Sequence, residues 1–171
     1  MPRSGDTAPA FTAPLADGDI GTFSLETALD ERTPVVLAFF PGAFTTVCSH
    51  EMRTFQDRLD ELRDTGAALY GISIDSPFAL NEFRDQLSLS FALVSDTNRE
   101  IVEAYDVATE FETVGIETIA KRAVFVVDET QTATYAWVSD DPGAEPDYDD
   151  LLAAVAHHGS GKGRSFSAWR E

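Results

Sequence analysis

The chain of 171 residues contains a single cysteine, Cys48, in a setting that favours thiol chemistry. Cys48 comes directly after a proline-containing loop at residues 41–47, and this loop follows the apolar run at residues 35–40. A buried strand that leads through such a loop into a helix places the cysteine in the first helical turn. Only the thiolate form of cysteine is a good nucleophile, and the dipoles of a helix N-terminus stabilise it. The segment therefore predicts a reactive cysteine.

The loop also carries a recognisable pattern of residue types. Pro41, Thr45 and Cys48 have the spacing Pro-x-x-x-Thr-x-x-Cys, which resembles the active-site loop of the peroxiredoxins, thiol peroxidases that reduce hydroperoxides. Residues 5–11 resemble the opening segment of that family, and residues 71–76 its second strand and turn. The resemblance thus covers most of the chain.

Within that family, the chain is similar to the one-cysteine type. It has no second cysteine, and its loop has the Pro-x-Ala-Phe-Thr form shared by the alkyl hydroperoxide reductase E and bacterioferritin comigratory protein-like group. The resemblance implies a thiol-specific peroxidase that reduces hydrogen peroxide and organic hydroperoxides through a cysteine sulfenic acid. It implies no cofactor.

Several groups near the cysteine can assist this reaction. The Thr45 hydroxyl can face the sulfur, accept a hydrogen bond from the hydroperoxide and donate one to the thiolate. Pro41 is rigid and lacks an N–H, so it can shield the thiolate from water. The backbone N–H groups of Val47 and Cys48 are unpaired at a helix start and can face the developing negative charge.

The reaction also needs a cation, and Arg122 precedes the apolar run at residues 123–127. From the residues alone, Arg122 is either a catalytic cation or an exposed arginine at a strand end. Residues 121–128 resemble the family's strand that bears the catalytic arginine, and this resemblance implies the first role. The guanidinium fork can hold the sulfur and both peroxide oxygens, which a lysine cannot. Arg53 is expected on the polar side of its helix.

Glu51 lies one helical turn after Cys48, so both residues share one helix face. An isolated carboxylate there would oppose formation of the thiolate. Paired with an arginine, Glu51 would instead orient that side chain, which is the role that the resemblance implies. The alternative is a solvated glutamate favoured by the helix dipole.

The histidines suggest two other chemistries, both of which we disfavour. Cys48, His50 and Glu51 carry metal-ligating groups, but near neighbours at a helix start point in different directions, so we expect no metal site. His157 and His158 could serve as bases in a cysteine hydrolase, yet the dipole at a helix C-terminus explains them better.

Strands and helices alternate along the chain. Continuous apolar runs at residues 35–40 and 67–74 predict strands that are covered on both faces. The other predicted strands are residues 91–94, 123–128 and 132–138. This order predicts an α/β protein with a central mixed sheet flanked by helices on both faces. It resembles the thioredoxin-like fold.

Capping residues and helical spacing locate the helices. The first main helix is predicted from about Thr46 to Gly66. Ser76 and Pro77 open a second helix as N-cap and first helical residue, and the last helix ends at Gly159.

Two predictions concern the region between residues 97 and 120. Residues 97–100, Thr-Asn-Arg-Glu, fit a capping box that begins a helix at residues 101–105. Residues 106–120 have no clear period and are predicted to form a long loop.

Length and composition indicate one domain at residues 1–158. Residues 159–171 differ, because they are rich in glycine and serine and carry three basic residues against one acidic residue. This tail is either a frayed terminus or an arm whose Phe166 and Trp169 dock on the body or on a partner subunit. No apolar run approaches the ~18 residues of a membrane span, and the start lacks the apolar region of a secretory signal. We therefore expect a cytoplasmic protein.

The chain is strongly acidic, with 30 acidic and 12 basic residues and a formal net charge of −18. Such a surface repels nucleic acid and anionic membranes, so neither is expected as a partner. It also keeps a protein soluble where salt screens charge. We favour a salt-rich cytoplasm over the alternative of an acidic protein from an ordinary cytosol.

The single cysteine limits how the oxidised protein can be reduced. No internal disulfide can form, so the resemblance points to an external thiol or a thioredoxin-like protein as reductant. The loop at residues 41–47 and the segment 106–120, with Phe111 and Ile116, should supply apolar surface near Cys48. The resemblance implies a homodimer or higher homo-oligomer built there.

The main alternative function belongs to another class of protein. In it, the chain is a redox-inactive thioredoxin-like binding or chaperone protein, and Cys48 is a small buried apolar residue. Pro41, Thr45 and Arg122 argue against this alternative, because a structural cysteine needs none of them. A thiol–disulfide exchanger is disfavoured by the lack of a second cysteine.

Overall fold

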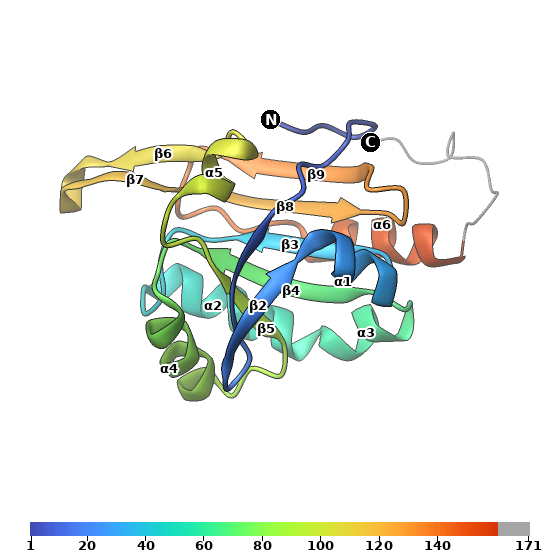
Figure 1. The fold of residues 1–171 in the computed structure, drawn as a ribbon, viewed down its shortest axis with the longest axis horizontal. Helices are drawn as coiled ribbons and strands as arrows, with labels where there is room; N and C mark the ends of the chain where they lie inside the picture. Colours follow the sequence, from blue (N-terminus) through green and yellow to red (C-terminus); the bar gives the residue numbers. More distant parts are fainter. Residues whose placement is uncertain (161–171) are drawn as a thin grey trace.

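The computed structural model describes residues 1–160, with side chains through residue 156. A seven-stranded sheet with the order β2-β1-β5-β4-β3-β8-β9 forms its centre (Figure 1). The strands are β1 (Thr12–Ala16), β2 (Ile20–Ser24), β3 (Val35–Phe39), β4 (Ala68–Ser73), β5 (Ala92–Ser95), β8 (Arg122–Val127) and β9 (Ala133–Ser139). β3, β4 and β5 are parallel to one another, whereas β1, β2, β8 and β9 pair antiparallel with their neighbours. The predicted mixed sheet is confirmed.

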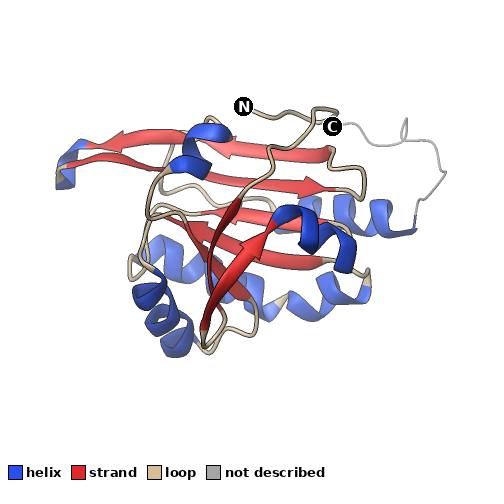
Figure 2. Ribbon diagram, viewed as in Figure 1, coloured by secondary structure: helices blue, strands red, loops and turns tan. Residues whose placement is uncertain are grey.

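Helices cover both faces of this sheet (Figure 2). They are α1 (Leu25–Glu31), α2 (Thr46–Asp57), α3 (Leu59–Asp64), α4 (Pro77–Leu87), α5 (Glu100–Ala104) and α6 (Tyr148–Ser160). Residues of α2, α3, α4 and α6 pack in one core cluster, and those of α1 and α5 in another. Val36 and Ala38 of β3 belong to the first cluster and Val35, Leu37 and Phe39 to the second. This alternation explains why β3 is apolar throughout.

The helix that carries Cys48 is held closely against the sheet. Met52 of α2 is fully buried, and it faces Gly71 of β4. A Cβ atom at Gly71 would lie 2.7 Å from Leu93 Cδ2 and 3.3 Å from Met52 Sδ. A side chain at position 71 would displace the end of Leu93 first, so glycine here leaves room for Leu93 and for Met52 of α2 against the sheet. The single helix predicted from Thr46 to Gly66 is in fact two, because it is interrupted at Arg58 between α2 and α3.

The capping box predicted at residues 97–100 is wrong. The N-cap of α5 is Arg99, which has a left-handed φ of 62° and makes no side-chain cap. The Asp96 carboxylate accepts instead from the N–H groups of Ile101 at 3.0 Å and Val102 at 2.9 Å. The tight turn after β5 brings this earlier aspartate to the free N–H groups, so Asp96 satisfies them.

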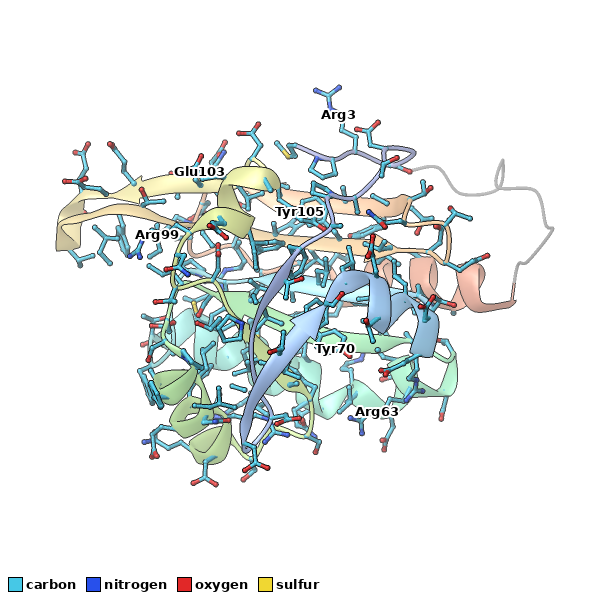
Figure 3. The ribbon with its side chains drawn as sticks, viewed as in Figure 1. Arg3, Arg63, Tyr70, Arg99, Glu103 and Tyr105 are labelled. Carbon is cyan, nitrogen blue, oxygen red and sulfur yellow. The ribbon has the colours of Figure 1, made fainter. Side chains whose placement is uncertain are left out.

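The long loop predicted at residues 106–120 is also wrong. This segment forms a hairpin of β6 (Ala108–Phe111), a 3₁₀ turn η1 (Glu112–Val114) and β7 (Ile116–Ala120), which extends beyond the main sheet (Figure 1). Its register shifts between Thr109 and Phe111, and most of its residues are at least partly exposed, so the sequence shows no clean two-residue alternation. Arg99 lies beside β7 of the hairpin (Figure 3), where its Nε donates to Thr118 O at 3.2 Å.

The last helix extends slightly further than predicted. α6 runs to Ser160 and so includes Gly159, where we expected it to end. The side chains of His157 and His158 and the proposed docking residues Phe166 and Trp169 lie outside the described residues. Within the described part of the chain, no helix is both long and apolar enough to cross a bilayer.

Candidate active site

Cys48 lies in the first turn of α2, as predicted. Thr45 is the N-cap of this helix, and Cys48 is 1% exposed. The N–H groups of a first helical turn have no acceptors within the helix. Val47 and Cys48 both belong to this turn, so their N–H groups are available next to the thiol.

Arg122 reaches the thiol from a neighbouring strand. Phe39 at the end of β3 pairs with Ala123 of β8, so Arg122 lies beside the start of the cysteine loop. Its Nη2 donates to Cys48 Sγ at 3.3 Å, and its Nη1 donates to Glu51 Oε1 at 2.5 Å. Arg122 is 1% exposed and Glu51 0% exposed. Both side chains are therefore buried at the site. The alternatives, an exposed arginine at a strand end and a solvated glutamate, do not hold.

A backbone carbonyl provides the third partner of the guanidinium. Pro142 O accepts from Arg122 Nη2 at 2.8 Å and from Nε at 3.3 Å. Pro142 belongs to the loop between β9 and α6. Arg122 is thus held from three sides, by the sulfur, the Glu51 carboxylate and this carbonyl, and its planar fork is fixed in orientation.

Burial dominates the electrostatics of the ion pair. Burial raises the pKa of Glu51 from 4.5 to about 7, against the opposing effect of Arg122, and Glu145 raises it further. Glu51 Oε2 has no hydrogen-bond partner among the side chains that the structure describes, which agrees with this cost of burial. Burial lowers the pKa of Arg122, but the negative charges of Glu51 and Cys48 outweigh it, so Arg122 stays a cation.

An aspartate just after β4 shapes the loop before Cys48. Asp75 Oδ2 accepts from Ala43 N at 2.8 Å and from Ser73 Oγ at 2.6 Å. Phe44, the residue after Ala43, has a left-handed φ of 67°, which is a strained conformation for a residue other than glycine. Its ring packs edge-on against Phe83 of α4 at 5.3 Å between centroids. These contacts hold the loop in its turn.

The two other predicted loop residues also line the site. Pro41 is buried, whereas Thr45 is exposed. Thr45 Oγ1 donates to Gly42 O at 2.8 Å, so the hydroxyl proton is directed to the loop and not to the sulfur as we expected. Its oxygen lone pairs remain able to accept a hydrogen bond.

A cavity of about 450 Å³ opens at these residues. Pro41, Thr45, Cys48 and Arg122 line one side of it. The hairpin supplies an apolar wall with Phe111, Val114, Ile116 and Ile119. The site therefore combines a thiol, a cation and hydrogen-bonding groups with a mostly apolar space.

The residues considered as metal ligands do not converge. Cys48 and Glu51 both contact Arg122, whereas His50 Nδ1 contacts the Glu145 carboxylate at 2.8 Å. The part of the chain with described side chains contains no group of three residues able to hold a metal ion.

Sequence reasoning missed three residues of the site. Asp75 lies in the segment at residues 71–76 that resembles the family, but nothing in the local sequence indicates that its carboxylate holds the cysteine loop. Pro142 and Glu145 lie in an acidic loop that has no periodicity. Pro142 acts through its carbonyl, which every residue has, so its type could not have revealed it.

Comparisons with known proteins identify the family of the chain. Residues 4–136 match the model of the AhpC/TSA family. The chain is 38% identical over 134 residues to the chloroplastic 2-cysteine peroxiredoxin of Chattonella marina var. antiqua, covering 74% of this chain and 65% of the relative. It is 33% identical over 105 residues to peroxiredoxin Bcp of Escherichia coli K12, covering 61% of this chain and 65% of the relative. The chain thus spans slightly less than two thirds of each of these relatives.

Solved structures show the same fold. The reduced 2-Cys peroxiredoxin of Plasmodium vivax superimposes with a TM-score of 0.82 at 21% identity, covering 99% of this chain and 90% of that one. Peroxidoxin BcpB of Mycobacterium tuberculosis superimposes with a TM-score of 0.77 at 26% identity, covering 91% and 97%. This chain belongs to the AhpC/TSA family of peroxiredoxins, has their thioredoxin-like fold, and with its single cysteine fits the one-cysteine, Bcp-like type.

Proposed function

We propose that this protein is a thiol-dependent peroxidase that reduces hydrogen peroxide and organic hydroperoxides at Cys48. The observation that carries the proposal is the buried contact of the Arg122 guanidinium with both Cys48 Sγ and Glu51. A cation held against a cysteine at a helix start favours the thiolate. The cavity beside it gives the hydroperoxide room to approach.

In the first step, the Cys48 thiolate attacks the terminal oxygen of the hydroperoxide. An S–O bond forms with two electrons from sulfur, and the O–O bond breaks. The leaving hydroxide or alkoxide takes a proton from solvent and departs as water or alcohol, while Cys48 becomes a sulfenic acid.

The surrounding groups stabilise this step. Arg122 stabilises the thiolate and the charge that develops on the oxygens, helped by the N–H groups of Val47 and Cys48. Thr45 accepts a hydrogen bond from the hydroperoxide through its free lone pairs, and Pro41 limits access of water to the sulfur. Glu51 orients Arg122.

An external thiol completes the cycle. It condenses with the sulfenic acid to form a mixed disulfide and water, and a second thiol then releases the Cys48 thiol and leaves as a disulfide. A small thiol or a thioredoxin-like protein fits this role, because the chain has no second cysteine.

We also infer that two copies associate around the site. The hairpin extends beyond the main sheet (Figure 1), and Val114 at its tip is 58% exposed. Phe44 in the cysteine loop is 52% exposed. A partner that covers this apolar surface would help to exclude water. The charge of −18 supports a salt-rich cytoplasm as the working environment.

Stopped-flow mixing of the reduced protein with hydrogen peroxide and with an organic hydroperoxide tests the function. We expect rapid loss of one thiol per chain and formation of a sulfenic acid, and no reaction in Cys48→Ser. That variant should fold, because the change in volume is small. A wild-type thiol that reacts no faster than free cysteine would instead support the redox-inactive binding protein.

A further inference from the structure

The loop between β9 and α6 has a specific task at the active site. It presents Pro142 O to two N–H groups of Arg122, at 2.8 and 3.3 Å. The start of the loop is placed by β9, whose Ser139 pairs with Arg122, and a turn at Asp141 adds hydrogen bonds from Gly143 N and Ala144 N. Side-chain contacts attach the rest of the loop to the body. At its start, Lys121 Nζ pairs with Asp140 Oδ1 at 2.8 Å. Asp140 is 88% exposed, and an ion pair in solvent contributes little to holding the loop in place.

A stronger attachment lies at the other end of the loop, at Glu145. His50 Nδ1 lies 2.9 and 2.8 Å from its two carboxylate oxygens, and the Tyr148 hydroxyl donates to Oε1 at 2.6 Å. The Glu145 side chain is only 26% exposed, whereas His50 is 68% exposed, so the partly buried bond from the Tyr148 hydroxyl is the better shielded of the two contacts. We call His50, Glu145 and Tyr148 the Glu145 clasp.

The clasp ties the loop to two helices at once. His50 lies on α2, two residues after Cys48, and Tyr148 is the first residue of α6. The Tyr148 ring packs edge-on against the buried Phe55 of α2, at 5.3 Å between centroids. The clasp therefore connects the loop carbonyl that holds Arg122 to the same helix that carries Cys48 and Glu51.

We propose that Glu145 is a positioning residue for peroxide reduction: through His50 and Tyr148 it holds the Pro142 carbonyl against Arg122 and so keeps the guanidinium fork aimed at the sulfur and the incoming peroxide. Without the clasp, Arg122 would keep Cys48 and Glu51 of α2 as partners but would lose the Pro142 carbonyl. This proposal rests on the role proposed above for Arg122.

The test compares two reactions of the same thiol in each variant. Reaction with hydrogen peroxide needs the oriented guanidinium, whereas alkylation by neutral iodoacetamide breaks no O–O bond. We expect Glu145→Ala to slow the peroxide reaction by about 10-fold or more, because small misplacements of catalytic groups cost up to ~100-fold, and to slow alkylation far less. Glu145→Gln should recover most of the rate, since its amide oxygen can still accept from Tyr148.

Two further variants make the outcome specific. Tyr148→Phe removes only the hydroxyl and should slow the peroxide reaction without blocking folding. Asp140→Asn removes the ion pair at the other end of the same loop and should react like the wild type. If Glu145→Ala reacts with peroxide at the wild-type rate, or loses both reactions equally, the proposal is wrong. If Glu145→Ala does not fold, a wild-type rate in Tyr148→Phe overturns it.

Arg122→Lys, measured in parallel, separates this proposal from the one on which it rests. A slow Arg122→Lys with a fast Glu145→Ala would contradict the clasp alone. A wild-type rate in Arg122→Lys would contradict the role of Arg122 itself.

Discussion

Arg122 and Cys48 are 74 residues apart in the sequence, yet the Arg122 guanidinium donates to the Cys48 sulfur at 3.3 Å. The contact exists because β8 pairs antiparallel with β3, which places the start of β8 next to the end of β3. The helix that follows β3 carries the nucleophile and the first residue of β8 carries its cation, so both groups lie at the same end of two adjacent strands. A rigid sheet holds such a pair more accurately than two loops would.

Replacing Arg122 by lysine tests the need for a planar fork. Arg122→Lys keeps the positive charge but cannot contact Cys48, Glu51 and Pro142 O together. We expect the rate of Cys48 oxidation by hydrogen peroxide to fall by about 10²-fold, the cost of removing an oriented donor. Stopped-flow measurement checks this. Arg53→Lys, at an exposed position on α2, is the control and should react at the wild-type rate.

The Thr45 hydroxyl is tested by a pair of substitutions. Thr45→Val removes the acceptor for the hydroperoxide and also the bond to Gly42 O, and we expect the peroxide reaction to slow by about 10²-fold. Thr45→Ser keeps the hydroxyl and should retain most of the rate. Equal rates in the two variants would show that the hydroxyl has no part in the reaction.

Glu51 should make the stability of the protein depend on pH. Its pKa is raised from 4.5 to about 7, so the folded state binds this proton more tightly than the unfolded state. The stabilisation from protonated Glu51 is therefore complete below pH 4.5 and is lost as the pH rises through about 7.

Urea unfolding at a series of pH values checks this prediction. In Glu51→Gln the neutral side chain cannot titrate, so the part of the decline in unfolding free energy that Glu51 contributes over this pH range should disappear. Parallel curves for wild type and variant would contradict the raised pKa. Glu145→Gln removes a negative charge that raises the Glu51 pKa, so it should move the decline to lower pH.

The hairpin should contribute to a dimer. Val114→Asp puts a charge on its exposed tip and should shift the protein toward monomer by weakening an apolar interface. Light scattering at micromolar concentrations and high salt measures the mass. Ile20→Asp, at an exposed position at the start of β2, is the control. A wild-type protein that is monomeric under these conditions would refute the dimer.

Reduction of the oxidised protein should respond to salt. Residues 1–158 carry a net charge of −20, which repels an anionic thiol such as glutathione. Salt screens this repulsion, so we expect the rate with glutathione to rise with ionic strength far more than the rate with neutral 2-mercaptoethanol or with hydrogen peroxide.

Mass spectrometry checks the same route directly. After peroxide and a small thiol, each chain should carry one thiol adduct on Cys48. A covalent dimer joined through two Cys48 residues as the sole product would contradict reduction by an external thiol. Such a bond requires the two Cα atoms to approach within ~7 Å, which a buried cysteine in a first helical turn does not favour.

The sequence by itself determined the central elements and the identity of the reacting group. The apolar runs of β3, β4 and β8 are long and buried on both faces, so hydrophobicity alone located them. Cys48, Thr45 and Pro41 lie within eight residues of one another, and a local spacing of this kind is visible without any tertiary contact.

Only the tertiary structure decided which distant groups meet at the cysteine. The hairpin at residues 108–120 was missed because it is partly exposed and irregular in register, so burial leaves no simple pattern in its sequence. Pro142 holds Arg122 through a carbonyl, and Glu145 holds the loop through contacts with two helices. Such contacts depend on how strands and helices pack, since backbone groups and long-range side-chain pairs have no signature in local residue order.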